Sequence, residues 1–464
     1  MFNRNIIARE FNIEIAINNE MAKAIDLWVN MYINKPPWID NNTKSMGLPG
    51  AIANELARLV TVEFESEIKN NDFLNKEYQK VIDSLRVNCE YACAKGGLVF
   101  KPYIKDRNIE IDIIQQDNFF PVSYNAHGDI TSAIFLEIKI VGDKKYTRVE
   151  YHTFENKIYA IYNKAYVKNC IDDLDNSLGK QISLSSVDEW TDIEEVVRIK
   201  NVSKPFFSYF KIPQANMIDD NSPLGVSVYA KAINLIREAD KQYSRVLWEY
   251  EGSELAVHAS EALLEDSKDE NGNTIKRLAK GKERLYRTVD IDDCLGDSGL
   301  KGGLDVFSPQ IRDESLFNGL NQILRRIEFN CGLAYGTLSN VDDVEKTATE
   351  IKTSKQRSYS TVKDIQKSLE QALKNLIIAM HDMAIISKIP VSDIDVDNDV
   401  SFNWDDSIIL DKDAELISMF NDVSANILRP EIYLAKKYGV SEEEALKMMP
   451  EVKETNKPPF EDLE

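Results

Sequence analysis

The stretch from residue 345 to about 386 constrains this chain most, because it contains neither glycine nor proline. A helix through it would be roughly 60 Å long at 1.5 Å per residue, far beyond the usual three or four turns. Its first part, 346–361, is polar and is predicted to be exposed. The second part carries apolar residues at helical spacing, which predicts a face that packs on another element: Val362, Ile365, Leu369, Leu373, Leu376, Met380 and Met383.

Two shorter helices precede the long one. The first is predicted from Ser222, with Pro223 at the first helical position and apolar residues at a 3.6-residue period up to Tyr250. The second is predicted from about 313 to 330 and is ended by glycines at 332 and 336. A polar loop leads from there to the long helix. The result is a rod-like frame, and compact active sites are not usually built in that way.

The chain before residue 222 is predicted to form an α+β body. Helical segments are predicted at 18–32, 49–68 and 73–95. From Gly97 the apolar period changes to two, and strands separated by turn signals continue to Tyr162. We interpret these strands as an antiparallel meander, followed by further short strands to about residue 212. We expect the helices to cover one face of this sheet.

The insert between the first two frame helices, residues 253–307, has a different character. A short strand at 254–258 is followed by an acidic run and an Asn271-Gly272 turn, which predicts a small hairpin subdomain. A basic stretch comes next. It fits a docking surface for a partner or a phosphate group, and it also fits a solvated strand face; its members are Lys276, Arg277, Lys280, Lys282, Arg284 and Arg287.

After Pro390 the chain is predicted to pass through an acidic linker into a closing strand at 400–404. Two short helices are predicted at 413–426 and 430–438. Ser441 and Glu444 then form a capping box for a last helix. The tail from 451 to 464 is polar and is expected to be loose.

Composition excludes several classes of protein. A chain of 464 residues corresponds to about three domains by length. No apolar run reaches the roughly 18 residues of a membrane span, and the N-terminus lacks a signal-peptide pattern. Five cysteines without paired spacing indicate buried reduced thiols. The net charge of −21 argues against a protein that grips DNA through Lys and Arg. It is compatible with a protein that lets DNA pass, and also with plain solubility.

The sequence offers little catalytic chemistry. Asp342-Asp343 and Asp405-Asp406 are the tightest acidic pairs, and paired carboxylates can hold two metal ions for nucleic-acid hydrolysis. Neighbours on a strand point to opposite faces, however, so helix capping or a turn explains Asp405-Asp406 better. No phosphate-binding loop and no hydrolase or metalloprotease motif occurs. We therefore predict no catalytic residue, no metal and no cofactor.

The order of these parts resembles the portal proteins of tailed bacteriophages, and most closely the branch from phages of Gram-positive hosts. The likeness covers about 15 to 450 and rests on length, order and several passages rather than on one signature. These passages are 90–103 (EYACAKGGLVFKPY), 117–125 (DNFFPVSYN), 222–229 (SPLGVSVY), 313–315 (DES) leading into 325–329 (RRIEF), 332–336 (GLAYG) and 400–406 (VSFNWDD).

The resemblance implies a particular α+β architecture and function. It implies a wing (1–221), stem helices (222–252 and 308–333), a clip (253–307), a channel loop (334–346), a long wing helix with a closing strand (347–406), and a crown with a flexible tail (407–464). It also implies a ring of about twelve copies at one capsid vertex, with double-stranded DNA passing along its axis. The other partners implied are a terminase motor, a head-completion or adaptor protein, and the major capsid and scaffolding proteins, with no membrane. The ring would assemble in the bacterial host cytoplasm and remain in the virion.

The resemblance also assigns roles to residues. The channel loop would carry Thr337, Leu338, Ser339, Asn340, Val341, Asp342, Asp343 and Lys346. An Asp342-Asp343 ring would repel a duplex with one charge per ~1.7 Å, whereas Arg325 or Lys346 would make weak sliding contacts. Whether Leu338 or an acidic residue reaches the DNA stays open. The stem residues that face either the channel or a neighbouring stem are Arg325, Arg326, Lys241 and Arg245. The basic stretch of the insert would meet the motor and later the tail connector.

Two alternatives remain beside the portal interpretation. One is another assembly protein of the particle, such as a minor capsid or contractile-particle component, through which no DNA passes. The other, which is weaker, is a metal-dependent nuclease that uses Asp405-Asp406.

Overall fold

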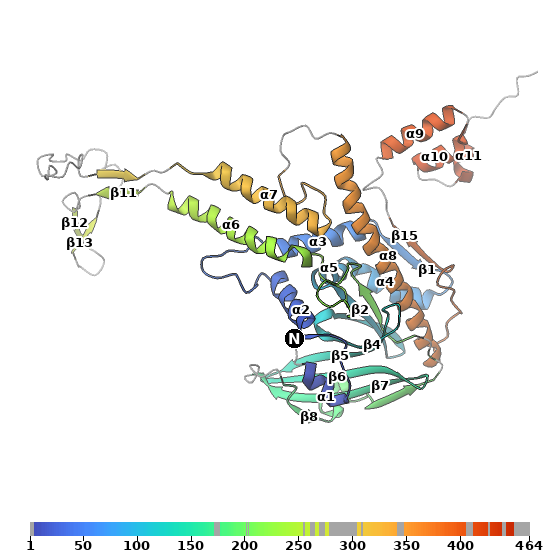
Figure 1. The fold of residues 1–464 in the computed structure, drawn as a ribbon. Coiled ribbons are helices and arrows are strands. Elements are labelled where there is room, and N and C mark those ends of the chain that lie inside the picture. The colour runs from blue at the N-terminus through green and yellow to red at the C-terminus, as the bar shows by residue number, and fades with distance from the viewer. Residues whose placement is uncertain are drawn as a thin grey trace, which may run out of the picture.

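The computed structural model describes residues 4–170, 177–200, 202, 204–253, 256–259, 265–268, 274–277, 304–307, 310–340, 348–404, 412–425, 427–438 and 442–449. Two helices, α6 (Ile233–Gly252) and α7 (Asp313–Cys331), lie side by side and extend together from an α+β body (Figure 1). The strands of the insert lie at their far end, and the C-terminal helices lie at another corner of the body.

Five helices form the first part of the body: α1 (Arg4–Phe11), α2 (Asn19–Tyr32), α3 (Leu48–Thr61), α4 (Asp72–Asp83) and α5 (Leu85–Lys95). Asn18 caps α2 by accepting a hydrogen bond from the Met21 N–H at 2.7 Å. The predicted helix 73–95 is in fact two helices, because the chain breaks at Ser84. There the hydroxyl donates to carbonyls of the preceding turn.

The prediction of a helix through 49–68 is wrong in its second half. Helix α3 ends at Thr61, and β1 (Glu65–Ile68) pairs antiparallel with β15 (Val400–Asn403). A positive φ of 49° at Glu63 prevents the helix from continuing. Burial then alternates along β1, as expected for a strand with one covered face. Because its partner lies near the other end of the chain, local sequence could not identify this strand.

The strands form two larger sheets rather than one. The predicted antiparallel meander is confirmed for the six-stranded sheet β4-β5-β6-β7-β8, with β9 also paired to β7. Its strands are β4 (Phe119–Tyr124), β5 (Ile130–Val141), β6 (Lys144–Glu155), β7 (Ile158–Asn169), β8 (Lys180–Ile182) and β9 (Val196–Ile199). A separate three-stranded sheet has the order β10-β2-β3, from β2 (Gly97–Lys105), β3 (Asn108–Gln115) and β10 (Ser208–Lys211).

The helices cover the smaller sheet. Helix α5 packs on β2 and β3, and α8 (Ala348–Ile386) packs on β2 and β10. The expectation that the N-terminal helices cover the meander is confirmed only in part. Helix α5 lies on β2 and β3, which form a separate sheet, whereas α1 contacts the six-stranded sheet: the Phe11 ring packs on Tyr151, and Glu10 accepts a hydrogen bond from the Tyr166 hydroxyl. The apolar stripe of α8 is confirmed: its residues are buried from Val362 to Met380, and Met383 is partly buried.

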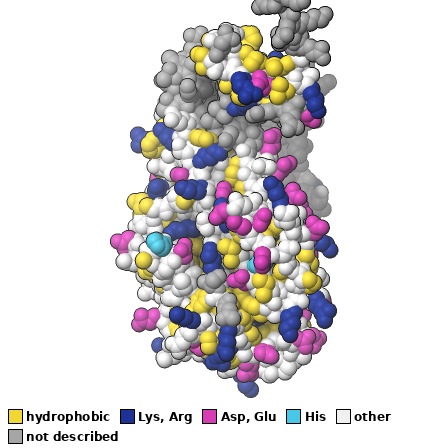
Figure 2. Space-filling view, turned by 90° about the vertical axis from the view of Figure 1, so that its right-hand side faces the viewer, with side chains coloured by type: hydrophobic (Ala, Val, Ile, Leu, Met, Phe, Trp, Pro, Cys, Tyr) yellow, Lys and Arg dark blue, Asp and Glu magenta, His cyan; other side chains and the backbone are white. Residues whose placement is uncertain are grey.

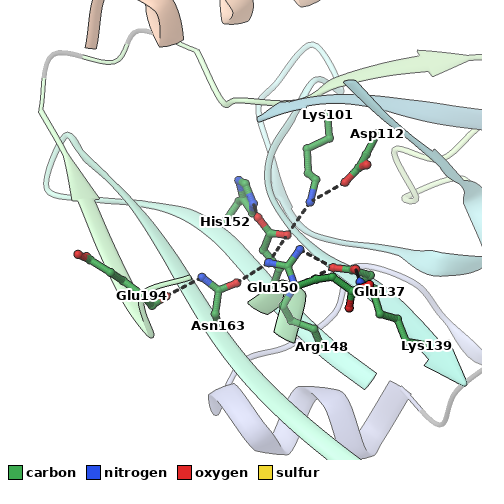
Figure 3. Close-up of polar contacts among 10 residues, drawn as sticks. Lys101, Asp112, Glu137, Lys139, Arg148, Glu150, His152, Asn163 and Glu194 are labelled. Atoms are coloured by element: carbon green, nitrogen blue, oxygen red, sulfur yellow. Dashed lines mark hydrogen bonds and ion pairs between the residues drawn. The ribbon is translucent and has the colours of Figure 1, made fainter. Parts of the chain in front are cut away.

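An ionic cluster joins the two sheets (Figure 3). Lys101 on β2 donates to Glu150 Oε2 on β6 at 2.5 Å. Arg148 lies 3.2 Å from the same oxygen and binds Glu137 on β5 at 2.7 Å, while His152 contacts the other oxygen of Glu150 at 2.7 Å. Burial alone would raise the pKa of Glu150, but Lys101 and Arg148 hold it well below its ordinary value. The carboxylate is therefore ionised inside the body.

The first frame helix begins later than predicted. Residues 222–229 are all buried and are not helical, and α6 starts only after a 3-10 turn, η5 (Ala230–Ala232). The reason lies at Gly225, where a Cβ would be 2.2 Å from the Gly96 carbonyl oxygen. The Gly225 N–H also donates to the Tyr209 hydroxyl at 2.8 Å. These tertiary contacts override the local helix signal.

The insert and the C-terminal part follow the predicted order. The insert leaves and returns on a ribbon of β11 (Ala256–Ala259) and β14 (Leu304–Phe307). The predicted hairpin is confirmed, with β12 (Glu265–Lys268) antiparallel to β13 (Thr274–Arg277). The predicted C-terminal helices are confirmed as α9 (Lys412–Ser424), α10 (Pro430–Tyr438) and α11 (Glu442–Met448).

The contact between Gly96 and Gly225 predicts the effect of a methyl group. Gly225→Ala should lower the free energy of unfolding by about 1–3 kcal/mol, because the new Cβ overlaps a backbone atom that cannot move alone. Gly50→Ala is the matched control, since no atom lies within 4 Å of its Cβ position on α3. Chemical denaturation of the three proteins measures the difference. Equal stability of the two variants would contradict this account.

Candidate functional site

The candidate site lies where α7 ends and the chain turns toward α8. Gly332 ends α7 in the left-handed conformation, with φ of 72°, and its N–H bonds to the carbonyls of Glu328 and Phe329. A Cβ on this glycine would lie 2.2 Å from Thr361 Oγ1 on α8. The turn therefore passes directly against the long helix, and only glycine fits there without displacing Thr361.

Glu328 holds the loop that follows. Its side chain is fully buried, and its Oε1 accepts hydrogen bonds from the backbone N–H groups of Gly336, Leu338 and Ser339 at 3.2, 2.6 and 2.8 Å. Its Oε2 accepts a hydrogen bond from Ser339 Oγ at 2.8 Å. Four donors from one short loop thus converge on a single carboxylate. Charged acceptors form the stronger hydrogen bonds, so this contact fixes the backbone of the loop.

Two more residues of α7 fix the last described residue of the loop. Asn321 accepts from the Asn340 N–H at 2.8 Å and donates to the Asn340 carbonyl at 3.3 Å. Arg325 donates to the same carbonyl at 3.4 Å. Because Asn321, Arg325 and Glu328 are spaced by four and three residues, they lie on one face of the helix. That face is the seat of loop 336–340.

Helix α8 contacts the same turn through Arg357. Its guanidinium lies 4.2 Å from the ring centre of Phe329 and 5.5 Å from that of Tyr335. Cation–π contacts of this kind contribute about 0.5–2 kcal/mol each. The end of α7, the loop and α8 are therefore held together by cation–π contacts as well as by hydrogen bonds.

The other end of the frame is closed by an ion pair next to the insert. Arg312, which precedes α7, donates from Nε and Nη2 to the two carboxylate oxygens of Glu249 on α6, at 3.0 and 2.8 Å. These hydrogen bonds lower the pKa of Glu249. A bidentate pair has a defined geometry, so it sets the spacing of the two helices where the insert begins.

The N-terminal part of the chain braces α6 near the body. The carboxylate of Asp240 accepts hydrogen bonds from Trp38 Nε1 and from the Met46 N–H, both at 2.9 Å. One turn further on, Ser244 Oγ accepts from the Lys44 N–H at 2.8 Å. Burial raises the pKa of Asp240. The segment between α2 and α3 thus fixes where α6 runs.

The predicted channel loop is described as far as Asn340. Thr337 and Asn340 are exposed, Leu338 packs against the core, and Ser339 is buried against Glu328. The rest of this predicted set, Val341, Asp342, Asp343 and Lys346, lies outside the described residues.

The predicted stem residues do not act as one group. Arg325 contacts the loop, whereas Arg326, the next residue, is exposed. On α6, Lys241 forms an ion pair with Glu238 of its own helix at 3.1 Å. Arg245 is exposed and donates to Gln242 at 3.5 Å.

Of the predicted basic stretch in the insert, the structure places two members. Lys276 and Arg277 lie on β13, in register with Asp266 and Glu265 on β12. Lys280, Lys282, Arg284 and Arg287 lie outside the described residues, as do Asp405 and Asp406.

No motif in the sequence predicted the anchors Glu328, Asn321 and Glu249. A signal for Glu328 does exist in the sequence. It directly follows Ile327 on the apolar stripe of α7 and stands four residues before Gly332. A glutamate on a buried face must find hydrogen-bond donors, so it marks a segment that folds back onto the helix.

The described ranges contain no group of three or more His, Cys, Asp or Glu residues able to hold a metal ion. Within those same ranges, no helix combines the length and apolar character needed to cross a bilayer.

The fold and the site define a structural protein: long helices fixed at both ends, and a loop anchored on them. A model of the family described as phage portal protein, SPP1 Gp6-like, matches residues 13–458, and the chain belongs to this family. It is a virion component that forms the DNA conduit of the portal vertex, and it is not an enzyme. The family assignment confirms the predicted resemblance and excludes the minor-capsid and nuclease alternatives.

No curated protein matches the chain. Among solved structures, a chain from the neck of a native GTA particle computed with C12 symmetry is similar, with a TM-score of 0.45 and 10% identity, over 94% of this chain and 98% of that one. A chain from the neck of an empty GTA particle, computed with C6 symmetry, gives the same values.

Replacement of Glu328 should loosen the loop without unfolding the protein. Glu328→Gln keeps one acceptor oxygen for the N–H groups of Gly336, Leu338 and Ser339 but removes the negative charge, so these hydrogen bonds lose the extra strength of a charged acceptor. We expect amide hydrogen exchange at 336–340 to become roughly tenfold faster or more. Glu314→Gln, at an exposed position of the same helix, is the control. Unchanged exchange in Glu328→Gln would show that the carboxylate does not hold the loop.

Proposed function

We propose that this portal protein forms a closed ring of about twelve subunits, with DNA passing along its axis. In this proposal 1–221 form the wing, 222–252 and 308–333 the stem, 253–307 the clip, 334–346 the channel loop, 347–406 the long wing helix with its closing strand, and 407–464 the crown. The stems would surround the DNA, and the channel loops would project toward it.

The observation that carries this proposal is the anchoring of loop 336–340 on α7. Burying a carboxylate costs several kcal/mol unless good hydrogen bonds replace its water, so the four donors to Glu328 fix the loop strongly. Asn321 and Arg325 then hold Asn340, the residue from which the chain continues to Asp342 and Asp343. In a symmetric ring, every copy would present these acidic residues at the same height along the channel.

Apolar side chains on the frame support the ring. Trp248 and Tyr250 on α6 are 66% and 41% exposed, and Phe317 on α7 is 44% exposed. The rings of Tyr250 and Phe317 lie 6.5 Å apart, so these exposed surfaces adjoin. Soluble monomers rarely leave such patches open. A neighbouring stem would cover them, and ring closure would leave no subunit with an uncovered side.

The charge distribution supports passage rather than tight binding of DNA. Figure 2 shows Lys and Arg side chains interspersed with Asp and Glu on the face it presents, instead of one basic patch. Each lysine or arginine placed on a phosphate strengthens the grip on DNA. A net charge of −21 keeps such contacts few, so a duplex could slide through the ring.

We also propose partners for the outer parts. The terminase motor and the head-completion or adaptor protein would dock on the clip. The basic residues 276–287 would contribute, although Lys276 and Arg277 lie opposite acidic residues in the hairpin. The major capsid and scaffolding proteins would surround the wing. No cofactor is required, because the separate motor supplies the energy for DNA movement.

The mass and symmetry of the purified protein provide the first test. We expect native mass spectrometry to show closed rings of about twelve times the 52.9 kDa chain, and negative-stain images to show a central hole. A chain that stays monomeric at high concentration, both alone and with scaffolding and capsid proteins, would contradict the proposal.

Deletion of 337–343 tests the role of the loop separately from assembly. Rings should still form, because α6, α7 and their exposed apolar residues are retained, but DNA packaging should stall or leak. The measurements are native mass spectrometry of the variant and nuclease protection of DNA in particles that carry it. Normal packaging with the loop removed would show that this segment does not act on DNA.

A further inference from the structure

Strand β5 has an open edge at the tip of the six-stranded sheet. One edge of β5 pairs with β6 from Ala133 to Val141. The opposite edge pairs with β4 only from Ile130 to Phe135. Among the strands that the structure describes, none pairs with β5 on this side beyond Phe135. Residues 138–141 therefore have a strand on one side only.

The hairpin geometry shows which backbone groups face the open side. Two residues, Gly142 and Asp143, separate β5 from β6, and Gly142 has a φ of 60°. In a two-residue hairpin the flanking pair, here Val141 and Lys144, is hydrogen-bonded, and the bonding alternates from there. The N–H and C=O groups of Ile138 and Ile140 consequently point away from β6, toward the open edge.

Three of the four side chains at this edge are apolar, and the fourth, Lys139, is paired with Glu189 at 2.7 Å. Ile138, Ile140 and Val141 are 38%, 67% and 63% exposed. Lys144 and Lys145 lie directly across the ladder from Val141 and Ile140. Natural proteins usually shorten, charge or cover such apolar edges, because an open edge pairs readily with another strand.

We propose that the edge at 138–141 binds an extended segment of another protein of the particle, which adds to the sheet as a further antiparallel or parallel strand. Main-chain hydrogen bonds to Ile138 and Ile140 would supply the register. The segment would carry apolar residues against the two isoleucines and an acidic residue within reach of Lys144. This inference rests on the proposed function, since it requires a particle in which other proteins surround the ring.

The place of the edge in the fold favours a protein partner outside the channel. The six-stranded sheet lies on the opposite side of the body from the turn between α7 and α8 (Figure 1). In the proposed ring that turn faces the DNA, so the sheet faces outward. A basic and apolar edge also suits an acidic and apolar peptide better than it suits a second copy's exposed lysines at the same edge.

Amide hydrogen exchange tests the edge directly. In purified rings, the amides of Ile138 and Ile140 should exchange rapidly. In particles assembled with the capsid and scaffolding proteins, the exchange rate of these amides should fall by about tenfold or more. Protection already present in the isolated ring would assign the edge to a second copy, and equal exchange in both states would show that nothing adds there. Either result would overturn the proposal.

Two variants test whether the edge matters for assembly. Ile140→Pro removes an outward N–H and leaves the ladder to β6, whereas Ile140→Lys keeps that N–H and makes the edge unfavourable for pairing. Both should form rings but lower the portal content of co-assembled particles roughly fivefold or more. Met217→Lys, at a 77% exposed apolar residue elsewhere, should have no effect. Normal portal content in Ile140→Lys would contradict strand addition at 138–141 and leave the proposed ring unaffected. Failure of the parent chain to form rings would instead contradict the proposed function.

Discussion

The close passage of two backbones at Gly96 and Gly225 is the constraint on which the rest of the structure depends. A Cβ on either residue would overlap the backbone of the other. Gly96 ends α5 and leads into β2, whereas Gly225 lies on the path to α6, so the helices, the small sheet and the frame meet at this point. Gln116 Nε2 donates to the Gly225 carbonyl, and the Gly225 N–H donates to the Tyr209 hydroxyl, so both backbone polar groups of this residue are held. The direction in which α6 leaves the body is set here.

Two buried carboxylates have structural roles in this protein. Glu150 is surrounded by Lys101 and Arg148, which come from different sheets, so it joins layers that are far apart in sequence. Glu328 is surrounded by the N–H groups of one loop, so it orders a short segment next to its own helix. Each buried charge is stable only because several partners replace the water it has lost. The first arrangement fixes the body, and the second fixes the exit of the loop.

The sequence predicted those elements whose structure depends mainly on residues close together in the chain. The apolar stripe of α8 and the hairpin of β12 and β13 were both predictable, because each depends on a pattern of nearby residues. Residues 222–229 carry a helix-start signal, but the contact of Gly225 with Gly96 overrides it. The location of the candidate loop was predicted, whereas its anchor was not, because the bonds to Glu328 exist only once the chain has turned at Gly332. The sequence carries only an indirect signal for this anchor, a glutamate next to the apolar stripe of α7, and that signal does not identify the donors.

A fixed loop also has a consequence for DNA in the proposed ring. Phosphates recur every ~1.7 Å along a duplex, so rigid loops at identical heights meet a nearly uniform charge wherever the duplex stands. Loops that could rearrange would instead adapt to one position and hold the DNA there. The hydrogen bonds to Glu328 and Asn340 prevent such adaptation at the base of the loop. A rigid loop therefore favours sliding of the DNA. The strong anchoring of the loop by Glu328 is compatible with a conduit that binds DNA weakly.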